Sequence, residues 1–177
     1  MSRAYNFAFI DGANLHLTYE NLDWELDYQK LRNYLEKKLD VIVAYYFIGR
    51  TEQNKDIYAK LETYGYTSKL KEPSPYIAEE EYCPHCKKLI KPAMQKYKSD
   101  CDSFMTLQII LDAHIYDRAV LITSDGDFDN LVKWLVLKDK LKLVFAPCRD
   151  GCSWLLKSVA KGRIGFIDDH RAELEKT

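Results

Sequence analysis

The sequence predicts an α/β protein, a Rossmann-like three-layer α/β/α sandwich with a mainly parallel central sheet. Short apolar runs alternate with segments whose apolar residues have helical spacing, a pattern typical of βαβ units. The runs Val41–Ile48 and Ala119–Thr123 are unbroken and apolar, as expected of parallel strands covered on both faces. Right-handed crossovers leave few topologies, and the leading one places the first strand beside Ala119–Thr123.

The chain opens with a predicted strand, Tyr5–Ile10, that stops at a turn formed by Asp11 and Gly12. Further strands are expected at Val41–Ile48, Tyr66–Leu70, Ala119–Thr123, Leu141–Ala146 and Ile164–Ile167, and helices at Tyr28–Leu39, Gln53–Tyr64, Ser103–Tyr116, Phe128–Leu137 and Ser153–Ala160.

One segment, Lys71–Lys98, lacks a clear strand or helix pattern. Structureless connections of this length are uncommon in compact domains unless they are functional. The prediction is a single domain over residues 1–177 that carries an inserted basic loop at residues 71–98.

Composition excludes several classes of protein. With 47% hydrophobic residues, 30% charged residues and a net charge of -1, the 177-residue chain is neither disordered nor broadly basic. No apolar run approaches the roughly 18 residues of a membrane span, and an acidic residue comes too early for a signal peptide. We therefore expect a cytoplasmic protein without a membrane partner. Its aromatic content is compatible with a homodimer.

Aspartates follow the ends of two predicted strands. Asp11 follows the first strand, and Asp125, Asp127 and Asp129 follow Ala119–Thr123. Parallel sheets bind ligands outside the carboxyl ends of their strands, where the strand order reverses, so these side chains are expected to share one crevice. Asp100 and Asp102 open the helix that leads into the second strand, and its N-terminus can point to the same crevice.

Carboxylates gathered in this way are expected either to be partly protonated or to bind a divalent cation. At about 4 Å and an effective dielectric constant near 20, each close pair costs roughly 4 kcal/mol. All-oxygen ligands suit Mg²⁺ or Mn²⁺, and such a site can activate a water for attack on a phosphodiester.

Each aspartate also has a purely structural interpretation. Asp100 and Asp102 can cap the following helix, Asp125 and Asp127 can form a turn, and Asp11 can be a turn former. Capping alone does not explain why they fall at one sheet edge. Other motifs fail: an EF-hand loop would need Gly at position 130 and Glu at position 136, and no GxGxxG, P-loop or GxSxG sequence is present.

Two motifs and their order resemble the NYN domain of the PIN-like nuclease superfamily. They are FIDGANL at residues 9–15 and TSDGDFDNLV at residues 123–132, with an acidic pair opening a helix between them. The resemblance covers about Tyr5 to Asp168. It implies a PIN-like sandwich and metal-dependent ribonuclease chemistry.

The resemblance also implies roles for individual residues. It assigns metal binding and catalysis to Asp11, Asp100, Asp125 and Asp127, with Asp102 as a further candidate ligand. Asn14 matches the asparagine that holds the first turn or the site, and Ser124 matches a supporting hydroxyl residue. Apart from the resemblance, Asp102 or Asp129 is expected to serve as an outer carboxylate. Lys98-Ser99-Asp100 departs from the family's usual Gly-Val-Asp.

The inserted segment contains a CPHC sequence. Cys83 and Cys86 have the spacing of half a structural zinc site, which needs four ligands. Cys148 and Cys152 can supply the second pair if their loop folds across, another subunit can supply it, or the thiols remain free. Five lysines nearby are candidates for phosphate contacts with RNA, although a solvated basic loop fits them as well: Lys87, Lys88, Lys91, Lys96 and Lys98.

The expected function is hydrolysis of RNA by a metal-activated water in an aspartate-rich crevice. The alternatives are a non-catalytic RNA-binding or regulatory module and a metal-dependent phosphatase.

Overall fold

The computed structural model describes residues 4–19, 23–51 and 55–177. Its centre is a six-stranded sheet in the order β10-β9-β8-β1-β2-β3, in which every neighbouring pair is parallel. The predicted α/β sandwich is therefore confirmed, and the strand order reverses at β1 and β8 as expected. The strands are β1 (Asn6–Asp11), β2 (Val41–Gly49), β3 (Thr67–Lys71), β8 (Ala119–Ile122), β9 (Leu141–Ala146) and β10 (Ile164–Phe166).

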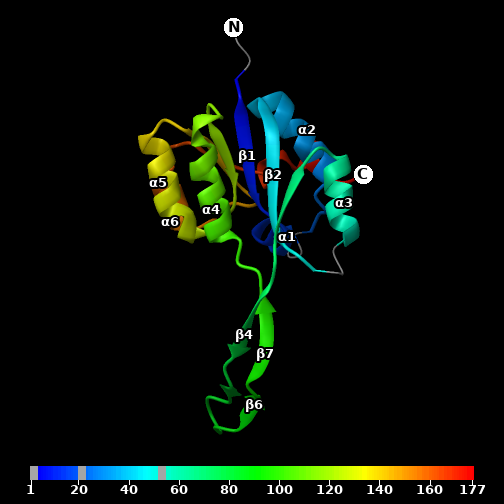
Figure 1. Ribbon diagram of the computed structural model, residues 1–177, viewed down its shortest axis with the longest axis vertical. Helices are drawn as coiled ribbons and strands as arrows, with labels where there is room; N and C mark the ends of the chain where they lie inside the picture. Colours follow the sequence, from blue (N-terminus) through cyan, green and yellow to red (C-terminus); the bar gives the residue numbers. More distant parts are fainter. Residues whose placement is uncertain (1–3, 20–22, 52–54) are drawn as a thin grey trace.

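Helices cover both faces of the sheet and make three layers (Figure 1). Alternate residues of β1 enter opposite layers, because successive side chains of a strand point to opposite faces. Phe7 and Phe9 belong to one core cluster, and Ala8 and Ile10 to the other. The first layer contains α4 (Asp102–Leu111), α5 (Asp129–Leu137) and α6 (Trp154–Val159), and the second contains α1 (Gly12–Tyr19), α2 (Tyr28–Leu39), α3 (Lys55–Thr63) and α7 (Arg171–Leu174).

Helix α2 shows how local sequence sets an element. The Asp27 side chain accepts hydrogen bonds from the first backbone N–H groups of the helix, which caps its N-terminus. Leu31 and Leu35, four residues apart, are buried against the sheet. The helix ends at Asp40, which adopts the left-handed conformation with φ 55°.

Several elements differ from the sequence prediction. Where a turn was expected after β1, the chain enters helix α1 directly, and α7 was not predicted. The helix expected at Ser103–Tyr116 ends at Leu111 and continues only as a short 3-10 helix, Asp112–His114. The helix expected from Gln53 begins at Lys55 within the described residues, and Gln53 itself lies outside them.

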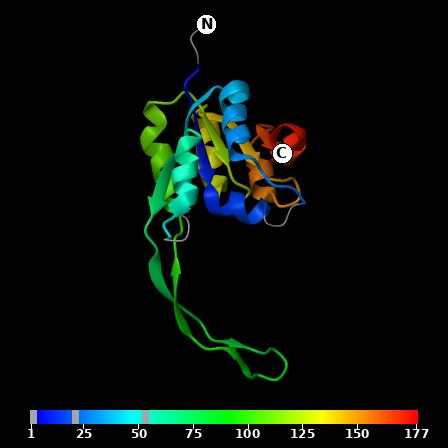
Figure 2. The ribbon, with the colours of Figure 1, turned by 90° about the vertical axis from the view of Figure 1, so that its right-hand side faces the viewer.

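The segment predicted as an inserted loop forms an antiparallel arm instead. Strands β4 (Ser74–Ala78) and β7 (Met94–Lys98) pair at its base, and β5 (Glu81–Tyr82) and β6 (Leu89–Lys91) pair beyond them. The arm, residues 74–98, projects away from the sandwich (Figures 1 and 2). Neither core cluster contains an arm residue.

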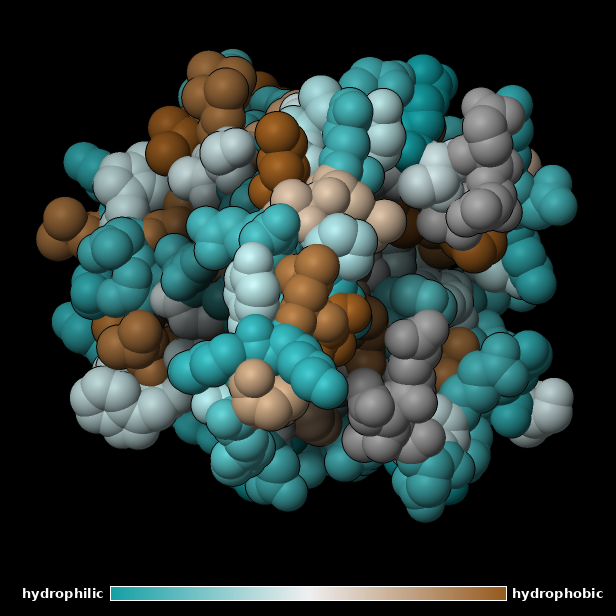
Figure 3. All heavy atoms as spheres, turned by 90° about the horizontal axis from the view of Figure 1, so that it is seen from below, coloured by the Kyte–Doolittle hydropathy of each residue, from teal (hydrophilic) through white to brown (hydrophobic). Residues whose placement is uncertain are grey.

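The arm carries apolar side chains in the open. The exposed large apolar residues of the arm are Tyr76, Ile77, Tyr82, Leu89, Ile90, Met94 and Tyr97. From below, the surface mixes hydrophilic groups with separate hydrophobic ones (Figure 3).

Among the described residues, no helix has both the length and the apolar character needed to cross a bilayer.

Candidate metal centre

The first wall of the site is the junction between β1 and α1. Asp11 is the last residue of β1, and Gly12 is the first residue of α1. A Cβ atom at Gly12 would lie 2.4 Å from Cε1 of Tyr46 and 2.6 Å from the carbonyl oxygen of Phe47. Only glycine fits this close approach to β2, and it allows the strand to turn directly into the helix.

Asp11 ties the ends of β1 and β8 together. One of its carboxylate oxygens accepts the backbone N–H of Asn14 at 3.0 Å, and the other accepts the Thr123 hydroxyl at 3.2 Å. Burial raises the pKa of Asp11, while these two hydrogen bonds lower it and the charge of Asp125 raises it further. Asp11 is only 6% exposed, so it lies beneath the surface at this edge of the sheet.

Asn14 provides a second tie between the same two ends. Its side-chain oxygen accepts both the backbone N–H and the hydroxyl of Ser124, each at 2.9 Å. The Thr123 hydroxyl also accepts the backbone N–H of Asp125 at 3.2 Å. These bonds fix the turn that follows β8 and thereby the position of Asp125.

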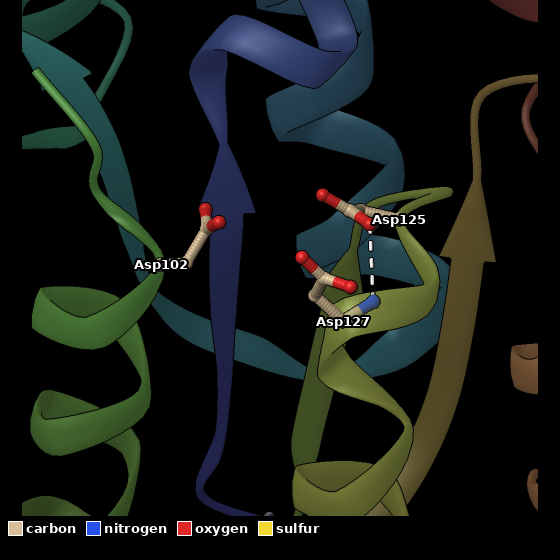
Figure 4. A group of neighbouring side chains, drawn as sticks. All are labelled: Asp102, Asp125 and Asp127. Carbon is tan, nitrogen blue, oxygen red and sulfur yellow. Dashed lines mark hydrogen bonds between the residues drawn. The ribbon is translucent and has the colours of Figure 1, made fainter. Parts of the chain in front are cut away.

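The turn after β8 is compact. The carboxylate of Asp125 accepts the backbone N–H of Asp127 at 3.0 Å and caps a short 3-10 helix, Gly126–Phe128. A Cβ atom at Gly126 would lie 2.6 Å from the hydroxyl oxygen of Ser153, so a larger residue here would have to displace that hydroxyl. Both carboxylates are held on the same side of this turn (Figure 4).

Three carboxylates from two elements converge. Asp102, in the first turn of α4, faces Asp125 and Asp127, and each offers an oxygen that lies within 4.8 Å of the others (Figure 4). Burial is the largest cause that raises the pKa of Asp102 to about 6, followed by the charges of Asp100, Asp11 and Asp125. The mutual repulsion is the condition that a bound divalent cation would relieve, and an all-oxygen donor set fits Mg²⁺ or Mn²⁺.

Asp100, a predicted ligand, lies outside this group. One of its oxygens accepts the backbone N–H of Asp102 at 3.2 Å, and the other pairs with Lys98 at 3.1 Å. The first of these bonds is the main cause that lowers the pKa of Asp100. Asp100 thus shapes the start of α4, while Asp102 places its carboxylate beside those of Asp125 and Asp127. Asp11 is also outside the three-residue group, although its charge reaches Asp102.

Two further residues have clear positions. Asp129, predicted as an outer carboxylate, pairs with Lys133 at 2.6 Å along α5. Thr123 was not predicted as a site residue, yet it joins Asp11 to the turn after β8. The sequence offers little to identify Thr123: it directly precedes Ser124, but a β-branched residue is expected there simply because a strand ends at that point.

The predicted RNA-binding lysines all lie on the arm, which leaves the sandwich at the edge where the site lies. Lys91 pairs with Glu81 at 2.7 Å, and Lys98 pairs with Asp100. At the base of the arm, the Lys71 side chain donates to the carbonyl oxygen of Asp100. The other three lysines are exposed: Lys87, Lys88 and Lys96.

The structure does not bring the four candidate zinc ligands together. Cys83 and Cys86 lie in the turn at the tip of the arm, whereas Cys148 and Cys152 lie between β9 and α6 in the sandwich. Over residues 4–19, 23–51 and 55–177, no group of three or more metal-ligating side chains includes any cysteine.

Comparison with known proteins gives a family and a fold. A family model described as the NYN domain matches residues 7–164. A crystal structure of a protein of unknown function from Vibrio parahaemolyticus is similar, with a TM-score of 0.72 and 21% sequence identity over 99% of each chain. No curated protein matches the sequence. At this identity the structural similarity concerns the fold alone.

Proposed function

This chain belongs to the NYN domain family of the PIN-like nuclease superfamily, and from that premise we propose that it is a metal-dependent ribonuclease. Its substrate is RNA, and the reaction is hydrolysis of a phosphodiester bond. The observation that carries the proposal is the convergence of Asp102, Asp125 and Asp127 within 4.8 Å of one another.

The chain's own residues have distinct tasks in this proposal. Asp102, Asp125 and Asp127 bind the cation, and their oxygens set its place in the crevice. Asp11 and Thr123 orient Asp125 through hydrogen bonds of 3.2 Å. A bound Mg²⁺ or Mn²⁺ supplies positive charge that activates water and offsets the charge of the phosphate.

Asn14 and Ser124 position the same turn from its other side. Both hydrogen-bond donors of Ser124 point to the Asn14 oxygen, so the turn keeps its shape in the presence of nearby negative charge. Groups that orient metal ligands are worth about 10–100-fold in affinity or activity. Asn14 and Ser124 are therefore positioning residues in this proposal.

Asp125→Asn tests the proposed activity directly. It preserves the shape of the side chain and removes a negative ligand, so Mn²⁺-dependent cleavage of single-stranded RNA should fall by more than about 100-fold. The matched control is Asp129→Asn, because Asp129 pairs with Lys133 and lies outside the group. Cleavage is followed on denaturing gels with Mn²⁺, with Mg²⁺ and with chelator.

The alternatives give different results in the same experiment. A non-catalytic RNA-binding module binds RNA but leaves it intact with either metal. A metal-dependent phosphatase hydrolyses small phosphate monoesters and leaves internal RNA bonds uncut. Equal cleavage by the Asp125→Asn variant and the wild type would refute the proposed role of the carboxylates.

A further inference from the structure

The tip of the arm is a tight turn that holds two thiols. Between β5 and β6, the carbonyl oxygen of Cys83 accepts the backbone N–H of Lys87 at 2.9 Å, and the N–H of Cys83 donates to the carbonyl oxygen of Lys88 at 2.8 Å. Lys87 has φ 58°, in the left-handed region that a lysine seldom adopts. Cys83 and Cys86, three residues apart in the sequence, both lie in this turn.

The environment of Cys83 favours its metal-binding form. The backbone N–H groups of Cys86 and His85 donate to its sulfur, and this is the main cause that lowers the pKa of Cys83. The Cys86 side chain lowers this pKa further. Thiolates are the ligands that structural zinc prefers, and N–H donors to sulfur stabilise them.

One chain supplies only half of a zinc site at the tip. Structural zinc takes four ligands. Among the described residues, no third His, Cys, Asp or Glu joins Cys83 and Cys86 in a metal-ligating group. Cys101 and Cys152 are buried in the sandwich, and Cys148 lies in the loop beyond β9. Since the described residues offer no second pair at the tip, another chain would have to supply it.

A second copy of the tip would supply the missing pair symmetrically. A two-fold axis through the ion would bring Cys83 and Cys86 of both copies to it, which makes four thiolate ligands. Closed two-fold symmetry is the commonest arrangement of homo-oligomers. The arm reaches well beyond the sandwich, so two tips can meet without contact between the sandwiches (Figures 1 and 2).

Charge and apolar surface at the tip also suit a second copy. Four thiolates around Zn²⁺ leave a net charge of about -2, which Lys87 and Lys88 of both copies would offset. Beside the cysteines, Tyr82, Leu89 and Ile90 are 51%, 48% and 53% exposed. Pairing of two tips would remove these side chains from water.

We propose that Cys83 and Cys86 of two copies of this chain bind one Zn²⁺ and thereby join the tips of two arms in a dimer. A two-stranded hairpin without a core is marginally stable, and metal binding would contribute folding free energy to the arm. The site is distinct from the carboxylate crevice and differs from it in ligand type and metal.

Metal content and molar mass test this together. Full-length protein purified with a reductant and supplied with zinc chloride should contain about one zinc ion per two chains and have the molar mass of a dimer. Removal of zinc by a chelator should give monomers, and added Zn²⁺ should restore the dimer. With Co²⁺ in place of Zn²⁺, the absorption spectrum should be that of a four-thiolate site.

Cys83→Ser and Cys86→Ser should each lose the zinc and dissociate the dimer, while circular dichroism shows an unchanged fold. Cys148→Ser is the matched control and should keep both zinc and dimer. Three results would each overturn the proposal: one zinc ion per monomer, a protein that takes up no zinc when it is supplied and keeps freely titratable thiols, or a dimer that persists after zinc removal. None of these readouts involves RNA, so they are independent of the ribonuclease activity.

Discussion

The first turn of α4 holds the carboxyl group of Asp102 against two other carboxylates. Partial burial and the charges of Asp100, Asp11 and Asp125 raise the pKa of Asp102 to about 6, from an ordinary 3.8. The folded protein therefore keeps this proton at a pH where the unfolded chain has lost it. Without metal, the site is a source of instability at neutral pH.

The pH dependence of stability follows from this shift. Between the unfolded pKa of 3.8 and the folded pKa of about 6, unfolding releases a proton, so the free energy of unfolding falls as pH rises. In chelator, wild-type protein should lose stability from about pH 4 to about pH 7, and Asp102→Asn should flatten this decline. Urea unfolding monitored by circular dichroism measures both.

The control for the pH experiment is Asp129→Asn, because Asp129 pairs with Lys133 and lies outside the three-carboxylate group. That variant should keep the wild-type slope. Mn²⁺ should stabilise wild-type protein more at about pH 7 than at about pH 5, because its ligands must be deprotonated. An identical slope in Asp102→Asn and wild type would show that titration of Asp102 does not cause the decline.

The sequence indicated which edge of the sheet carries the aspartates, because strand ends can be read from apolar runs. It favoured Asp100 as a ligand and gave Asp102 only as a further candidate, whereas the three-carboxylate group contains Asp102 and not Asp100. Both lie at the start of the same helix, and their roles differ through contacts that the sequence does not show. Asp100 accepts the backbone N–H of Asp102 and pairs with Lys98, while Asp102 lies near Asp125 and Asp127. Thr123 escaped prediction because its hydrogen bond to Asp11 joins residues 112 apart in sequence.

At the scale of elements, the passage from β1 into α1 depends on one glycine. Gly12→Ala would bring a Cβ atom to 2.4 Å from the Tyr46 ring, and overpacking of this kind costs about 1–3 kcal/mol. The expected result is a lower midpoint in urea together with weaker Mn²⁺ binding, since Asp11 precedes Gly12. Chemical denaturation and metal titration measure the two effects.

Gly165→Ala is the matched control for Gly12→Ala. Its added Cβ would meet no atom closer than 3.6 Å, which is an ordinary contact. Its stability should stay within about 0.5 kcal/mol of wild type. If both substitutions had the same small effect, the steric explanation for Gly12 would be wrong.

The arm is a separate element in its packing, since it contributes nothing to either core cluster. Ser74 and Lys98 are opposite partners at its base, so an Asn-Gly turn can replace residues 75–97. Thermal unfolding of this variant should show a stability within about 1 kcal/mol of wild type, with the sandwich intact. A molten or aggregated product would mean that the arm supports the fold.

Most elements with a buried face could be predicted, and the arm strands without one could not; the short helices α1 and α7 were missed although Leu15 and Leu174 are buried. Strands of the central sheet and the amphipathic helix α2 match their predicted positions closely. The arm strands carry apolar residues that remain exposed, such as Ile77 at 76% and Tyr97 at 64%, so no alternation of burial marks them. Helix α1 follows its strand without the turn that an Asp-Gly pair suggests.

Across the whole molecule, the near-zero net charge of -1 hides a separation of charge. Carboxylates lie at one edge of the sheet, and exposed lysines lie on the arm that leaves the same edge. RNA bound by both would have its backbone neutralised by the arm while a phosphate reaches the crevice.

Charge reversal on the arm tests this arrangement. Lys87→Glu with Lys88→Glu should weaken RNA binding and reduce the slope of log affinity against log salt by about 1.4, if each lysine contacts one phosphate of a single strand. Lys138→Glu is the control, because that exposed residue lies at the C-terminal end of α5. Filter binding at several salt concentrations measures the slopes, and equal slopes would remove the tip from the RNA-binding surface.

The hydrogen bonds that assemble the site also set when it can form during folding. The Thr123–Asp11 and Ser124–Asn14 bonds join residues 112 and 110 positions apart. Contacts of such long range form only after much of the chain entropy has been lost, and parallel sheets have no short-range route to them. A partly folded chain therefore lacks the proposed cation site, and a cation that binds only the native state would slow unfolding and leave the folding rate unchanged.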